Sequence, residues 1–167
     1  MKLQVAPHFL LDFSDRLREI AAPREVMTAA VELLGGHLGA MRVGYSEMEA
    51  DGIHLHVEQD WRAAGVSSVA GRHHLDSYGP DIADAYRSGE LVAIDDFDTD
   101  ARTAGKPAAA AHHAFGVRAQ LAVPLVKAGR LIALLFLHAG EPRRWSEEEI
   151  ALVREVAERT WAAVERA

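Results

Sequence analysis

The sequence predicts an α+β domain built around one antiparallel sheet, and three observations support this class. Near both ends of the chain, apolar residues recur every three or four positions, which is the spacing of amphipathic helices. Between the ends, apolar and polar residues alternate in several short runs, which is typical of strands. The chain has 167 residues, enough for one hydrophobic core, so we expect a single domain over residues 1–167.

Two helices are expected at the N-terminus. The first lies within residues 1–22 and carries an apolar stripe made of Phe9, Phe13, Leu17 and Ile20. Pro23 suits the first position of a second helix, because proline needs no backbone N–H there. The apolar pattern of this second helix runs to Leu38, and Gly35-Gly36 is expected to loosen its end.

From residue 41 onward, apolar residues recur at every second position. Residues 41–46 predict a strand, and Asp51-Gly52 indicates a tight hairpin turn. A return strand follows over residues 53–61. Its apolar side chains are expected to share one face, and they are Ile53, Leu55, Val57 and Trp61.

Shorter elements fill the middle of the chain, and two longer strands follow them. We expect, in order, a short strand within 67–76, a helix over 81–87, a strand over 91–94, a polar loop over 97–106 and a helix over 107–115. Strands over 120–126 and 131–137 are joined by a turn at Ala128-Gly129. The second of these strands is apolar on both faces, as in the centre of a sheet.

A long helix over residues 146–167 ends the chain. Ser146 and Glu149 have the spacing of a capping box, in which each side chain satisfies a backbone N–H of the other. Its apolar stripe consists of Ile150, Val153, Ala157, Trp161 and Val164. We therefore expect about six antiparallel strands, with helices from both termini on one face and short helices and loops over the other.

Composition excludes several classes of function. With 18 Lys and Arg against 25 Asp and Glu, the net charge is −7, which argues against binding to nucleic acid. The longest apolar run, 131–137, is too short to cross a bilayer, and the N-terminus does not resemble a signal peptide, so we expect a cytoplasmic protein without a membrane partner. The absence of cysteine excludes disulfides, thiolate metal sites, cysteine nucleophiles and thioether attachment of a cofactor.

The last third of the chain resembles GAF domains. The run from Phe115 to Leu125, followed by Gly129, Leu134 and His138, is similar to the last two GAF strands. The ending over 141–149 resembles GAF domains that precede the kinase modules of bacterial sensor histidine kinases. This resemblance implies a sensory module that holds a small ligand on one sheet face. Its terminal helices would pair between protomers in a homodimer and pass a signal to an output domain outside this chain.

Two segments are similar to the more distant phytochrome-type GAF domains. Residues 81–87 resemble the Asp-Ile-Pro segment that lies against a bilin, although Ala83 replaces the proline, and His138 matches a histidine that faces the chromophore. The histidine expected before Gly116 has no counterpart at the matching spacing, and no PAS domain precedes the module. A bilin bonded through cysteine is excluded, which leaves a non-covalent bilin or haem as an alternative.

The resemblance places the candidate ligand-binding residues in three segments; they are Tyr78, Asp81, Ile82, Tyr86, His112, His113 and His138. Adjacent helical residues point about 100° apart, so only one of His112 and His113 can face a cavity. A hydrogen-bonded core histidine is the alternative for His138. We expect no metal site, because His54 with His56, His73 with His74, and the acidic loop 95–100 are each explained by solvent-exposed polar segments.

The preferred function is small-molecule sensing, without catalysis in this chain. Free methionine sulfoxide reductases of the GAF type depend on cysteines, and neither common hydrolase motifs nor the cyclic-nucleotide signature of GAF domains is present. The alternative from another class is a ligand-free module for dimerisation and signal relay. In the predicted homodimer, the apolar stripes of the two terminal helices pack against the partner protomer. The alternative is that both stripes are fully buried within one protomer.

Overall fold

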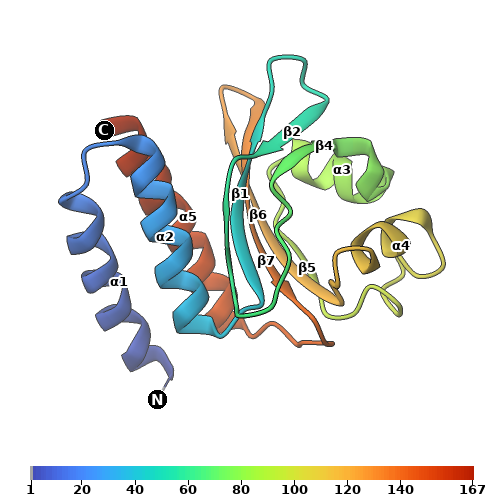
Figure 1. Ribbon diagram of the computed structural model, residues 1–167, viewed down its shortest axis with the longest axis horizontal. Coiled ribbons are helices and arrows are strands. Elements are labelled where there is room, and N and C mark those ends of the chain that lie inside the picture. Colours follow the sequence, from blue (N-terminus) through green and yellow to red (C-terminus); the bar gives the residue numbers. More distant parts are fainter. Residues whose placement is uncertain (1) are drawn as a thin grey trace.

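A seven-stranded antiparallel sheet separates two layers of helices in the computed structural model, which describes residues 2–167 and, from residue 8 onward, their side chains (Figure 1). The helices are α1 (Lys2–Arg18), α2 (Pro23–Leu38), η1 (Leu75–Tyr78), α3 (Pro80–Arg87), α4 (Pro107–His113) and α5 (Glu147–Arg166). The strands are β1 (Arg42–Met48), β2 (His54–Val57), β3 (Asp60–Arg62), β4 (Gly71–His74), β5 (Val92–Ile94), β6 (Ala119–Lys127) and β7 (Arg130–Ala139).

The strand order is β4-β2-β1-β7-β6-β5, with β3 also paired to β1. In Figure 1, α2 and α5 lie on one side of the sheet with α1 outside them, and α3 and α4 lie on the other side. The predicted fold class and the placement of the terminal helices are therefore confirmed, with α1 packed on the other two helices.

Strand alternation creates two hydrophobic cores, one on each face. On β6 and β7, residues such as Leu121, Leu135 and Leu137 pack against the helices of the terminal layer. Their neighbours Ala122 and Phe136 belong to the second core, under η1, α3 and α4. Because β7 is one of the two central strands of the sheet, it is buried on both faces, as its sequence predicts.

The predicted return strand over 53–61 is wrong in one respect, because it is broken by a bulge. On β1, the three-residue step from Gly44 to Glu47 faces a four-residue step from His56 to Asp60. One extra residue in a strand turns the side chains that follow it to the opposite face of the sheet. Trp61 therefore packs in the terminal-helix core, against Gly35, whereas Leu55 and Val57 face the other core. Ile53, predicted to share that apolar face, is 41% exposed.

Helix ends and turns follow local rules. The capping box of α5 is confirmed: Glu149 N–H donates to Ser146 Oγ at 3.1 Å, and Ser146 N–H donates to the Glu149 carboxylate at 3.0 Å. Helix α2 does not loosen at Gly35 but continues to Leu38 and ends at Gly39 in the left-handed conformation. The β6–β7 turn places Ala128 at φ 51° and Gly129 at φ 75°.

The apolar stripes of the terminal helices are largely used inside the chain. Phe13, Leu17, Val153 and Ala157 are almost completely buried, and Trp161 is half-buried against the same core. From residue 8 onward, Leu11 is the large apolar side chain left most exposed on these helices, at 62%. Within the described residues, every helix is too short or too polar to span a membrane.

Candidate ligand-binding site

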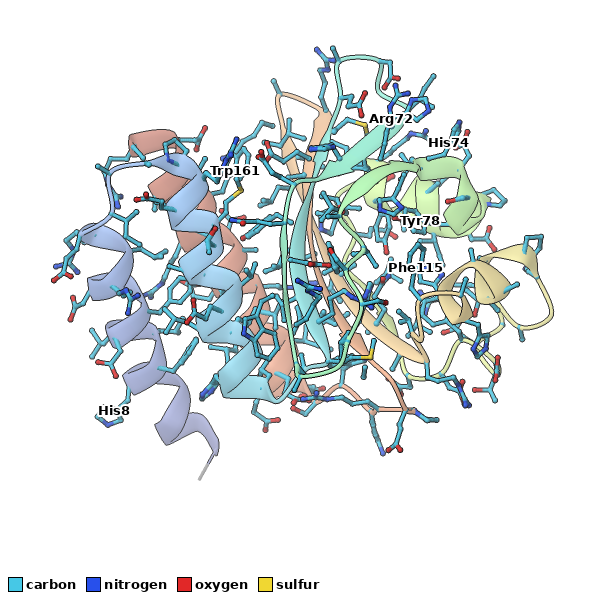
Figure 2. The ribbon with its side chains drawn as sticks, in the orientation of Figure 1. His8, Arg72, His74, Tyr78, Phe115 and Trp161 are labelled. Carbon is cyan, nitrogen blue, oxygen red and sulfur yellow. The ribbon has the colours of Figure 1, made fainter. Side chains whose placement is uncertain are left out.

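A cavity of about 80 Å³ lies in the second core, between the sheet and the layer formed by η1, α3 and α4. Figure 2 shows Tyr78 and Phe115, which both line it, on the side of the sheet that carries α3 and α4. Its apolar wall is formed mainly by Val57, Val69, Phe115, Val117, Leu134 and Phe136. Its polar groups come from Ser46, His73, Ser77, Tyr78, Tyr86, His112, Gln120 and His138.

The structure brings four of the seven predicted site residues to this cavity and leaves three outside it. Those that line it are Tyr78, Tyr86, His112 and His138. Their positions range from residue 78 to residue 138, so sequence proximity does not explain their meeting.

Helical periodicity explains the residues that do not reach the cavity. Asp81 lies on the exposed face of α3, one position before the buried Ile82, which packs in the core beside the cavity without lining it. His113 points away from His112 and pairs with Asp98 at 2.6 Å on the surface. The placement of Asp81 and Ile82 on the cavity wall is therefore wrong, and of the two adjacent histidines only His112 faces inward.

Three polar residues form a row across the cavity side of the sheet. Arg42 on β1 is paired with His138 on β7, and His138 is paired with Gln120 on β6. The Arg42 guanidinium lies 2.9 Å from His138 Nδ1, and His138 Nε2 lies 2.8 Å from Gln120 Oε1. Gln120 Nε2 in turn lies 3.1 Å from the Tyr86 hydroxyl of α3.

The direction of these hydrogen bonds follows from Arg42, because a guanidinium can only donate. His138 Nδ1 must accept, so the ring proton sits on Nε2 and is donated to Gln120 Oε1. The Gln120 amide then donates to the Tyr86 oxygen, and the Tyr86 hydroxyl keeps its own proton for another acceptor. Burial, together with nearby His112 and Arg42, holds the pKa of His138 well below its usual value, so the ring is neutral.

Arg42 is held at the bottom of this row by backbone carbonyls. Its guanidinium is completely buried and donates to the Ser67 carbonyl at 2.8 and 3.1 Å and to the Phe115 carbonyl at 3.1 Å. Asp60, whose side chain is 1% exposed, lies 3.8 Å away and supplies a countercharge. Arg42 therefore connects β1 to the two loops that border the cavity.

His112 is the other buried histidine, and one of its nitrogens is free. Its Nδ1 donates to the Ala108 carbonyl one helical turn earlier, at 2.7 Å. The ring stacks on Phe97 with centroids 4.0 Å apart and lies 5.5 Å from the Tyr78 ring. Burial lowers the pKa of His112 to about 4, so its Nε2 is an unprotonated acceptor at neutral pH. Among the side chains that the structure describes, those of residues 8–167, none forms a hydrogen bond with this Nε2.

Among the residues that shape the site but could not be assigned to it from the sequence are Arg42, His73, Gln120 and Phe136. Arg42 and Gln120 are polar residues within apolar strands. Because buried polar groups require hydrogen-bond partners, this pattern could have indicated a buried polar cluster. His73 was assigned to an exposed strand end, but it lines the cavity and its Nε2 donates to the Val69 carbonyl at 2.7 Å. The position of the Phe136 ring could not be predicted from the sequence, because it depends on the absence of a side chain at Gly44 on the neighbouring strand. A Cβ at Gly44 would lie 2.5 Å from the Phe136 ring.

The remaining polar clusters have partners among themselves. In the acidic loop, Asp96 pairs with Arg118 at 3.0 Å and Asp100 with Arg102 at 2.7 Å. His54 pairs with Asp51 at 2.6 Å. Over residues 2–167, no group of three or more His, Asp or Glu side chains has an arrangement that could hold a metal ion.

Comparison with known proteins identifies the family. The model of the GAF domain matches residues 22–164, and the chain belongs to this family. Among solved structures, it is similar to a far-red absorbing protein in its dark state with bound biliverdin IXa, with TM-score 0.81 and 16% identity over 95% of this chain and 98% of that one. The phycocyanobilin-bound GAF domain of a cyanobacterial phytochrome gives TM-score 0.80 and 19% identity over 96% and 94%.

A third similar structure comes from an enzyme. The free methionine-R-sulfoxide reductase of Neisseria meningitidis, in complex with its substrate, gives TM-score 0.78 and 15% identity over 99% of this chain and 91% of that one. At these identities the structural matches establish the fold. The comparison with curated proteins found no match.

The cavity does not fit a bilin. A dry cavity of about 150 Å³ holds one benzene molecule, and this cavity measures about 80 Å³. A tetrapyrrole, which has four five-membered rings, would require displacement of the η1–α3–α4 layer. The one guanidinium in the polar row, Arg42, is already committed to Ser67, Phe115 and His138. In this conformation, the residues present hold neither a bilin nor a haem.

Proposed function

We propose that this GAF domain is a sensory module that binds a small molecule in the cavity between the sheet and α3 and α4. The observation that carries the proposal is His112 Nε2, an acceptor that faces the cavity without a hydrogen-bond partner among the described side chains, in a wall that combines apolar and polar groups. A ligand N–H that bonds to this nitrogen would contribute roughly 0.5–1.5 kcal/mol, the net value of a typical hydrogen bond.

The architecture offers a route from the cavity to the terminal helices. His138 and Gln120 face the cavity, while the adjacent Leu137 and Leu121 on the same strands pack against the helix layer. A ligand that shifts the polar row would therefore move strands on which α2 and α5 rest. In our proposal, α5 passes this change to an output domain outside this chain, such as a histidine kinase, in the cytoplasm.

We also propose that two copies associate through the terminal helices. The exposed Leu11 and the half-buried Trp161 belong to the apolar surface that packing within the chain leaves on this layer, together with partly buried residues such as Phe9. Trp161→Glu would weaken such a dimer. Sedimentation at micromolar concentration should show a dimer that the substitution converts to monomer, and a parent chain that is already monomeric would contradict this part of the proposal.

A ligand-free relay module is the second candidate, and the small volume of the cavity favours it. The two functions are separated by an NMR screen, in which the amide signals of the labelled protein are followed as small molecules of diverse chemistry are added. A compound that shifts the signals of Tyr78, Tyr86 and His112, but not those of α1, supports sensing. If no compound shifts the cavity signals, the ligand-free function is correct.

A further inference from the structure

We infer that the cavity takes a small, uncharged, planar molecule that both donates and accepts a hydrogen bond, of the azole or primary amide kind. This inference rests on the proposed function and specifies the ligand class. It follows from the volume of the cavity, from the charge state of its walls, and from two hydrogen-bonding atoms whose roles the structure determines.

The first of these atoms requires a donor on the ligand. His112 Nδ1 has only the Ala108 carbonyl as its partner, at 2.7 Å, and a carbonyl can only accept. The ring proton is therefore on Nδ1, and Nε2 carries a lone pair. Phe97 stacks on one side of the ring and Tyr78 lies against it, so its orientation is held by packing. A ligand N–H placed at Nε2 would satisfy the unpartnered acceptor.

The second atom favours an acceptor on the ligand. The Tyr86 oxygen accepts from Gln120, whose own orientation is determined by His138 and Arg42. The proton of the Tyr86 hydroxyl has no acceptor among residues 2–167. Burial raises the pKa of Tyr86 further above its usual value, so the hydroxyl remains a donor throughout the physiological range.

The walls exclude charge. Both buried histidines are neutral, because burial lowers their pKa values. Arg42, the charged member of the polar row, is already bonded to Ser67, Phe115 and His138 and does not line the cavity. An anion would therefore lose hydration without gaining a lysine or arginine partner, and a cation would find no carboxylate at the cavity wall.

The cavity measures about 80 Å³, and a cavity of about 150 Å³ holds one benzene molecule, so we take one five-membered ring as the size of the ligand. A molecule of five non-hydrogen atoms binds no tighter than the low micromolar range. Fast exchange is then expected, and NMR titration is the suitable assay.

Three rings of equal size test the inference, using the full chain: pyrazole donates and accepts, pyrrole only donates, and furan only accepts. We expect pyrazole to shift the cavity signals and furan to bind about tenfold more weakly, because furan leaves His112 Nε2 unsatisfied. In His112→Phe, which retains the stack on Phe97, pyrazole and furan should bind equally. His113→Phe is the matched control, because His113 lies outside the cavity, and it should retain the tenfold preference.

The outcomes distinguish the two proposals. Equal binding of pyrazole and furan by the parent chain would overturn the inference. If pyrazole has no effect but benzoate or biliverdin IXa shifts the cavity signals, the ligand class is wrong and the sensing function stands. If none of these probes shifts a cavity signal while the parent spectrum is that of a folded protein, both proposals fail.

Discussion

Removal of the Arg42 side chain is the perturbation with the largest expected effect on the site. Arg42→Met fills a similar volume but leaves His138 Nδ1 and the Ser67 and Phe115 carbonyls without their donor. It also leaves Asp60, whose side chain is 1% exposed, without its buried cation. Breaking one partner of a buried ion pair costs about 3–5 kcal/mol, and we expect the free energy of unfolding to fall by that amount.

Urea denaturation followed by far-UV circular dichroism measures this loss. Arg62→Met is the matched control, because Arg62 also contacts Asp60, at 3.3 Å, but its side chain is 43% exposed. Exposed ion pairs contribute roughly 0–1 kcal/mol, so the control should unfold at almost the same urea concentration as the parent. If Arg42→Met and Arg62→Met had equal, small effects, Arg42 would not be the group that orders the polar row.

Three further predictions concern pH, a turn and a close contact. First, the folded pKa of His112, about 4, lies below its unfolded value of 6.5. Between these two pH values the unfolded chain therefore binds more protons than the folded chain. The free energy of unfolding should fall as the pH drops from 6.5 toward 4, and His112 should account for about 3 kcal/mol of this fall. Denaturation across this range should show a shallower decline in His112→Phe, and an unchanged decline would contradict the assignment. Second, Ala128 at φ 51° occupies a position of the β6–β7 turn that favours Asn. Ala128→Asn should raise the free energy of unfolding by about 1 kcal/mol, and a decrease would refute the strain at this turn. Third, a Cβ at Gly44 would lie 2.5 Å from the Phe136 ring. Gly44→Ala should destabilise by about 1–3 kcal/mol and should be partly rescued by Phe136→Leu; the absence of rescue would show that the clash lies elsewhere.

Elements with strong local signals could be predicted from the sequence. Helix α5 has a capping box and a continuous apolar stripe, β6 has apolar residues at every second position, and β7 is apolar on both faces, so their types needed little tertiary information. The bulge between β2 and β3 could not be predicted in this way. It depends on which residues of β1 pair with each segment, and it places Trp61 against Gly35.

The candidate site was predictable only in part, for a related reason. Tyr86, His112 and His138 are polar or aromatic residues within largely apolar segments, which made them recognisable candidates, and all three line the cavity. Asp81 stands out equally, but its position one residue before the buried Ile82 turns it to the surface. Arg42 and Gln120 acquire their roles from cross-strand pairing with His138, which is a property of the assembled sheet.

The central claim is that ligand contact at the cavity is coupled to the terminal helices through the sheet, and hydrogen exchange tests it most directly. The exchange of each segment would be compared with and without saturating pyrazole, in the parent and in His112→Phe. We expect slower exchange in η1 and α4, which border the cavity, together with a change in α5 on the opposite face, and neither effect in the variant. Exchange of α4 and α5 that is identical with and without pyrazole in the parent chain would contradict the account.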